Sequence, residues 1–194
     1  MRSTRWTLVA VVVTCAALAA AAFAASRASA PAGKPSRTAL VARGEYLVNV
    51  MGCGDCHTPG TLFGSPDHSR KLSGSELGWR GPWGVSYARN LTPDTDTGLG
   101  YWSEKELFNA LRTGVKPDGK VLLPPMPWPN TAVLSDADLN AVVAFLQSLS
   151  PVKHAVPNAV APDRAAAITG SIIDMPAPSA WDAPRPVDTG GTQK

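Results

Sequence analysis

Cys53-Gly54-Asp55-Cys56-His57 is the part of this 194-residue sequence from which the rest is best understood. Two thiols lie three positions apart and an imidazole follows directly, so five consecutive residues offer three groups that can bind one ligand. The whole chain has three cysteines, which is too few for a disulfide-dense scaffold. The motif therefore predicts a ligand site that needs little folded structure before it forms.

The spacing of the motif is the CxxCH pattern of covalent c-type haem attachment. Each thiol, Cys53 and Cys56, can add to one vinyl group of a haem edge, and His57 then presents its imidazole to the iron. Three other interpretations remain open: a zinc site that recruits His68 or His154, a thioredoxin-like dithiol, and a plain disulfide. The adjacent histidine favours haem.

The N-terminal segment has the features of a secretory signal. Arg2 and Arg5 precede an apolar run over residues 6–25, and small residues end the segment, so residues 1–30 are predicted to be a signal peptide. An uncleaved anchor formed by residues 6–25 is the alternative, because about 20 apolar residues can span a bilayer. Export to the periplasm agrees with haem attachment, which takes place outside the cytoplasm.

The net charge of +3 carries no information about partners. Removal of the predicted signal takes away Arg2, Arg5 and Arg27 and no acidic residue, so the mature chain is neutral by sequence. A scattered and small basic excess does not indicate a nucleic-acid partner.

Changes of composition divide the remainder of the chain into three parts. Residues 31–37 are predicted to be a linker and residues 38–152 a single domain. After that domain, residues 153–194 are rich in Ala and Pro and form the predicted C-terminal tail. The apolar residues Ile172, Ile173 and Trp181 suggest that part of this tail is a docked segment and not a pure random coil.

Three helices are predicted inside the domain. The first covers residues 38–51, the second begins after the capping box Ser103-Glu104-Lys105-Glu106 and ends at Gly114, and the third begins after Ser135 and ends before Pro151. Residues 58–102 show neither helical nor strand periodicity and are predicted to be mostly loop. So long a loop in a compact domain needs something to wrap around.

Met126 is the predicted second axial ligand of the iron. It stands in Leu123-Pro124-Pro125-Met126-Pro127-Trp128-Pro129, where four prolines fix φ and reduce the entropy lost when the segment is ordered. Met51 lies beside the CxxCH motif on the proximal side, Met175 lies in the tail, and His68 lies in a polar loop, so each is a weaker candidate. An ordinary core methionine is the alternative interpretation of Met126.

These motifs resemble class I c-type cytochromes, over about residues 38–152. Within that class the sequence resembles the single haem modules of the cytochrome c subunits of alcohol, aldehyde and sugar-acid dehydrogenases. The matching stretches are Arg43-Gly44-Glu45-Tyr46-Leu47, Cys53-Gly54-Asp55-Cys56-His57-Thr58-Pro59, Asn90-Leu91-Thr92-Pro93-Asp94, Thr97-Gly98-Leu99-Gly100-Tyr101-Trp102-Ser103, Met126-Pro127 and Ala144-Phe145-Leu146. Those subunits often carry three haem modules, and this chain has one CxxCH motif.

The resemblance implies an all-α class I cytochrome c fold, with crossing N- and C-terminal helices around one covalently bound haem and with long loops. Gly44 would let the first helix approach Phe145, and a glycine inside a helix usually has such a packing reason. Five aromatic residues are candidate walls of the haem site: Trp79, Trp83, Tyr87, Trp102 and Trp128. Arg80, Arg89 and Asn90 are candidates for bonds to the haem propionates.

The function predicted from the sequence is electron transfer by a monohaem c-type cytochrome. Its donor would be a periplasmic or membrane-bound dehydrogenase and its acceptor an oxidase or another cytochrome of the respiratory chain. One alternative is a haem enzyme, such as a peroxidase or a sulfur-compound oxidoreductase, which would need an open sixth position on the iron. Another is a structural or electron-transfer subunit of a larger complex, anchored through residues 6–25.

Overall fold

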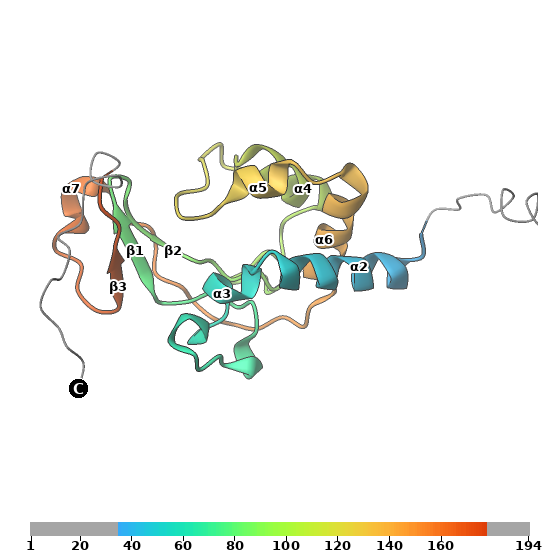
Figure 1. The fold of residues 1–194 in the computed structure, drawn as a ribbon, viewed down its shortest axis with the longest axis horizontal. Coiled ribbons are helices and arrows are strands. Elements are labelled where there is room, and N and C mark those ends of the chain that lie inside the picture. Colours follow the sequence, from blue (N-terminus) through green and yellow to red (C-terminus); the bar gives the residue numbers. More distant parts are fainter. Residues whose placement is uncertain (1–34, 178–194) are drawn as a thin grey trace, which may run out of the picture. The chain divides into compact units, whose positions relative to one another are not determined.

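The structure is a computed structural model that describes residues 35–177; the predicted signal and anchor fall outside this range. None of the helices that it describes between these residues is long and apolar enough to cross a membrane. The chain order of the elements is α2 (Arg37–Val50), α3 (Cys53–His57), η1 (Thr61–Phe63), η2 (His68–Arg70), β1 (Gly78–Gly81), β2 (Gly84–Tyr87), α4 (Glu104–Thr113), α5 (Trp128–Ala132), α6 (Asp136–Ser148), α7 (Pro162–Ala165) and β3 (Ile172–Asp174) (Figure 1).

The core of the domain lies where α2 packs against α6. Gly44 is the point of closest approach: a Cβ there would overlap the Ala141 carbonyl oxygen and lie 2.7 Å from Phe145 Cβ. The predicted approach of Gly44 to Phe145 is therefore confirmed. The buried apolar side chains of this contact belong to Leu47, Val48, Leu72, Val142, Phe145 and Leu146.

Local capping signals set the ends of α4 and α6, as the sequence predicted. The Ser103 hydroxyl accepts from the Glu106 backbone N–H while the Glu106 carboxylate accepts from the Ser103 N–H, which completes a capping box. Gly114 then ends α4 with φ of 70°, in the left-handed region where glycine carries no Cβ penalty. Ser135 caps α6 by accepting from the Asp138 N–H.

A small sheet within and beyond the segment predicted as loop distinguishes the fold from an all-α domain. β1 and β2 form an antiparallel hairpin with Trp79 opposite Ser86, and β3 pairs parallel to β1 with Ile173 opposite Trp79. The fold is therefore helical with a small sheet. The strands are four and three residues long, too short to show a period, and β3 is supplied from the far end of the chain.

The segment that follows α6 returns along the domain to the strands, as the orange part of Figure 1 shows. We call residues 153–174 the C-terminal strap. Two backbone hydrogen bonds of 2.8 and 2.9 Å join Val160 of the strap to Val85 of β2. The buried His154 at its beginning contacts the Ser73 carbonyl oxygen and the Glu76 carboxylate through its two ring nitrogens, at 2.9 and 2.7 Å. The strap is thus held at its beginning and at Val160, and the pairing of β3 with β1 holds its far end.

Candidate functional site

One cavity of about 400 Å³ lies between the CxxCH motif and the proline-rich loop. Its lining is mainly apolar and comes from α2, α3, α4, α6, the end of β2 and the loops around residues 99–102 and 121–127. Both cysteines, His57 and Met126 are among the lining residues. A pocket of this size with a few convergent polar groups is the usual form of a cofactor site.

The two cysteines reach the cavity from α3. Gly52 precedes this helix with φ of 67°, a left-handed conformation that turns the chain sharply out of α2. Burial raises the pKa of Cys53 to about 11 and also raises the pKa of Cys56. Both groups are therefore thiols at neutral pH, whereas a thioredoxin-like centre requires a depressed thiol pKa.

His57 is held in a single orientation and tautomer. Its Nδ1–H donates to the Arg89 backbone oxygen at 2.7 Å, so the lone pair is left on Nε2. Burial lowers the pKa of His57, and the bond to Arg89 offsets part of that effect. A neutral imidazole whose outer nitrogen is fixed to a carbonyl is the usual state of a histidine that ligates a metal.

The loop after His57 is pinned by further hydrogen bonds. The Gly74 N–H donates to the His57 carbonyl oxygen at 2.8 Å. The buried Thr58 hydroxyl accepts from the Leu72 N–H at 3.0 Å, and Leu72 has a positive φ of 60°. These bonds connect His57 and the next residue, Thr58, to residues 72–74.

Met126 lines the same cavity from the segment 123–129, which we call the ligand loop. The Met126 N–H donates to the Leu123 carbonyl oxygen at 3.2 Å, and the Met126 carbonyl oxygen accepts from Trp128 at 2.9 Å. Met51 also lines the cavity, from the end of α2. Met175 and His68 are not among the lining residues.

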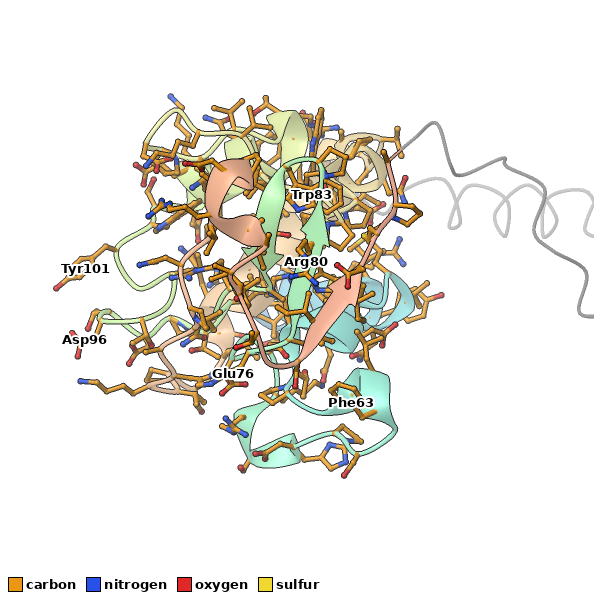
Figure 2. All side chains as sticks on the ribbon, turned by 90° about the vertical axis from the view of Figure 1, so that its left-hand side faces the viewer. Phe63, Glu76, Arg80, Trp83, Asp96 and Tyr101 are labelled. Carbon is orange, nitrogen blue, oxygen red and sulfur yellow. The ribbon has the colours of Figure 1, made fainter. Side chains whose placement is uncertain are left out.

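Three of the five aromatic candidates line the cavity, namely Trp79, Tyr87 and Trp102. Trp83 instead lies at the tip of the β1–β2 hairpin, where its Nε1–H donates to the Ser86 hydroxyl at 3.2 Å (Figure 2). Trp128 packs over Gly114, where it leaves no room for a side chain. The two tryptophans that do not line the cavity therefore support turns that border it.

The three polar candidates for bonds to the haem propionates also differ in where they lie. Arg80 forms a two-point contact with the Asp174 carboxylate, and Figure 2 shows it between β1 and β3. The buried Asn90 donates to the Thr97 hydroxyl and accepts from the Thr92 N–H, so it braces its own loop. Of the three residues Arg80, Arg89 and Asn90, Arg89 alone lines the cavity.

Lys116 and Ala159 are among the lining residues that sequence reasoning missed. Lys116 begins the segment Lys116-Pro117-Asp118-Gly119, whose Pro, Asp and Gly are typical of a turn. The turn brings the Lys116 N–H to the Lys120 carbonyl oxygen. Ala159 belongs to the strap, and nothing in its sequence context indicates a contact with residues so distant in the chain. Tyr101 lies between the lining residues Leu99 and Trp102 yet points into solvent, with 83% of its surface exposed (Figure 2).

The residues of this cavity fit a covalently attached haem. An apolar space holds two protonated thiols, a neutral imidazole with Nε2 free and a thioether, the donor set that c-type attachment requires. The zinc alternative finds no support in residues 35–177, because no group of three or more His, Cys, Asp or Glu side chains there could hold a metal ion.

Comparisons with known proteins identify the family of this domain. The sequence model of the family described as Cytochrome c matches residues 41–150. The alcohol dehydrogenase (quinone) cytochrome c subunit of Gluconobacter oxydans is 38% identical over 115 residues, which are 59% of this chain and 22% of that protein. The gluconate 2-dehydrogenase cytochrome c subunit of Pantoea cypripedii is 38% identical over 128 residues, 66% of this chain and 27% of that protein.

A third relative is a diheme cytochrome c-type protein of Cereibacter sphaeroides, 32% identical over 122 residues, which are 61% of this chain and 39% of that protein. The chain spans about a quarter of the length of the two dehydrogenase subunits. The similarity therefore covers only part of each larger relative.

Proposed function

The chain belongs to the cytochrome c family, and from that premise we propose that it transfers single electrons from a dehydrogenase to a respiratory acceptor. The observation that carries the proposal is the cavity in which His57, with Nε2 free, and Met126 both take part. Two fixed axial ligands suit electron transfer, because neither position is left for a substrate.

We assign each member of the site a role. In this assignment Cys53 and Cys56 would hold one haem c through thioethers, and His57 and Met126 would be the protein ligands of its iron. The bound haem supplies an iron that alternates between the ferric and ferrous states. One haem is proposed because the chain has one CxxCH motif. Thioether ligation raises the reduction potential relative to two histidines, which suits a dehydrogenase donor and an oxidase acceptor.

The protein's own groups contribute position and environment. The Arg89 carbonyl oxygen keeps the Nδ1 proton of His57 in place at 2.7 Å and so keeps Nε2 unprotonated. The mainly apolar lining excludes water, which lowers the local dielectric constant and strengthens the electrostatic effects within the site. The ligand loop limits how far Met126 can move, because proline fixes φ before and after it.

The partner and location are proposed from the relatives and the N-terminal sequence. Both dehydrogenase relatives are named as cytochrome c subunits, so a dehydrogenase is the proposed donor. Residues 1–30 would direct the chain to the periplasm, where residues 6–25, if retained, would attach it to the inner membrane. The haem-enzyme alternative is less favoured, because the part of the cavity lining formed by residues 35–177 contains no His or Cys outside the motif.

The visible absorption spectrum of the ferric protein tests the function. Low-spin haem with a far-red sulfur-to-iron band is expected, and Met126→Ala should abolish that band. Met51→Ala is the matched control, since it removes a thioether from the same cavity and should leave the band in place. Loss of the band in Met51→Ala alone would transfer the ligand role to Met51. Ready binding of small ligands by the unaltered protein would instead support a haem enzyme.

A further inference from the structure

Arg89 joins the proposed axial ligand to the C-terminal strap through its two ends. Its backbone oxygen accepts the Nδ1–H of His57 at 2.7 Å. Its guanidinium donates through one nitrogen to the backbone oxygens of Val156 and Pro157, at 3.0 and 2.8 Å. One residue therefore connects the histidine to a segment 67 positions further along the chain.

The strap is fixed independently on either side of these two carbonyls. Before them, the backbone N–H of His154 donates to the Thr97 hydroxyl at 3.0 Å and its ring contacts Ser73. After them, Val160 makes its two backbone bonds with Val85. The oxygens that receive the Arg89 guanidinium thus belong to a stretch of chain with little freedom to move.

The guanidinium makes no ion pair with any carboxylate among residues 35–177, which separates it from Arg80. Arg80 also donates to strap carbonyls, those of Ala165 and Ile168, but its main partner is Asp174 and it does not line the cavity. The two arginines thus both anchor the strap, and only Arg89 is also bonded to His57.

We propose that Arg89 is a positioning residue for His57. The strap holds the side chain of Arg89 and thereby fixes the position of the Arg89 carbonyl oxygen. That oxygen, through its bond to Nδ1, sets the basicity of the His57 imidazole. The inference rests on the proposed function and adds a means of tuning it. A strong bond at Nδ1 makes an axial histidine more basic and favours the ferric iron, so weakening this bond raises the reduction potential. The strap, a segment outside the residues matched by the family model, thereby takes part in the site.

Arg89→Lys tests the inference in the haem-loaded full chain. Lysine keeps the positive charge, but its ammonium ends one atom short of the guanidinium nitrogen that serves both carbonyl oxygens and is more strongly hydrated, so the substitution separates geometry from charge. We expect the Nδ1 proton of His57 to exchange with solvent about ten-fold faster by NMR, because the two bonds that fix the Arg89 side chain to the strap are weakened. The reduction potential should rise in parallel.

Arg80→Lys is the matched control, because it makes the same change at the other anchor of the strap. Its proton exchange and potential should equal those of the unaltered protein. Unchanged exchange in Arg89→Lys, or equal acceleration in both variants, would overturn the inference. In that event the dependence of the far-red band on Met126 would still decide the proposed function separately.

Pro157→Ala provides a second route if Arg89→Lys does not accumulate with haem. This change frees φ at the strap end of the bond and leaves Arg89 in place. The same NMR measurement should show faster exchange at His57, by a smaller factor than ten-fold. Exchange at the unaltered rate would again contradict the inference.

Discussion

The two proposed axial ligands are held in opposite ways. His57 depends on hydrogen bonds with residues distant in sequence: its ring donates to the Arg89 carbonyl oxygen, and its own carbonyl oxygen accepts from the Gly74 N–H. Met126 lies between prolines, and the bonds of its own backbone go to Leu123 and Trp128, which are its near neighbours. One wall of the cavity therefore exists only when the whole domain is folded, whereas the other is restricted mainly by its own prolines, with one bond from outside, from the Ser86 hydroxyl to the Pro124 carbonyl oxygen.

Loss of the histidine itself should have the largest effect. His57→Ala is expected to lower the haem content of the purified protein by at least ten-fold, because removing even an outer partner of a metal ligand costs about 10–100-fold in affinity. Absorbance of haem per mole of protein measures this. His68→Ala is the control, since His68 is exposed and does not line the cavity. A full haem content in His57→Ala would remove the histidine from the site.

The hydrogen-bonded wall should be sensitive to a single lost acceptor. Thr58→Val leaves the Leu72 N–H without its partner and is expected to lower the free energy of unfolding by about 1–3 kcal/mol. Denaturant titration measures the change.

The neighbouring Thr61 offers a matched comparison on the same loop. Its hydroxyl oxygen is buried and has no partner among the described residues, so Thr61→Val should leave stability unchanged or raise it. Equal losses in the two variants would show that packing, and not the hydrogen bond to Leu72, holds this wall.

Substitutions in the ligand loop should have a weaker effect than those on the His57 side of the cavity. Pro127→Ala adds freedom to the unfolded ligand loop worth about 0.4–1 kcal/mol, so imidazole should displace Met126 about two- to five-fold more readily. A spectroscopic titration of the ferric protein with imidazole tests this. Pro66→Ala, on an exposed loop away from the cavity, should leave the imidazole affinity unchanged. An unchanged affinity in Pro127→Ala would mean that the prolines do not restrict Met126.

The smallest expected effect is a pH dependence of the free energy of unfolding that arises on the His57 side of the cavity, from Asp67. Bonds from Ser69 and Arg70 lower the pKa of Asp67 to about 2, below its ordinary value of 3.8. Because the folded pKa is depressed, this stabilisation is complete above about pH 4 and is lost as the pH falls toward 2.

Asp67→Asn should therefore differ from the unaltered protein above pH 4, with the two unfolding free energies converging near pH 2. Chemical denaturation at several pH values measures both proteins. The ligand loop contains no ionisable side chain, so substitutions there should shift stability by the same amount at every pH in this range. A constant difference for Asp67→Asn would contradict the lowered pKa.

The elements predicted correctly from sequence are those whose signals are local. The ends of α4 and α6 follow from serines that cap them and from Gly114, and the approach of Gly44 to Phe145 follows from a glycine in the middle of α2. Each of these signals acts within a few residues or reports one close contact. The flanking prolines also singled out Met126, which lines the cavity, whereas its role as a ligand stays a prediction.

The features missed from sequence depend on pairing between distant segments. β3 gains its partner only when residues 172–174 reach β1, and Ala159 lines the cavity only because Val160 pairs with Val85. Trp83 and Trp128 carry no local signal that separates a turn support from a cavity wall. The sequence pattern identifies aromatic residues in a loop but not which way each of them faces.

The pairing of Val85 with Val160 also bears on the order in which the site can be completed. Contacts between residues so far apart close a long loop and form slowly. The CxxCH motif leaves the ribosome well before the strap does. A chain ending at Pro151 would have both thiols and both proposed ligands, yet it would lack Ala159 and the carbonyls that hold the Arg89 side chain. The last wall of the cavity is thus completed only after residues 153–160 have joined the chain and paired with β2.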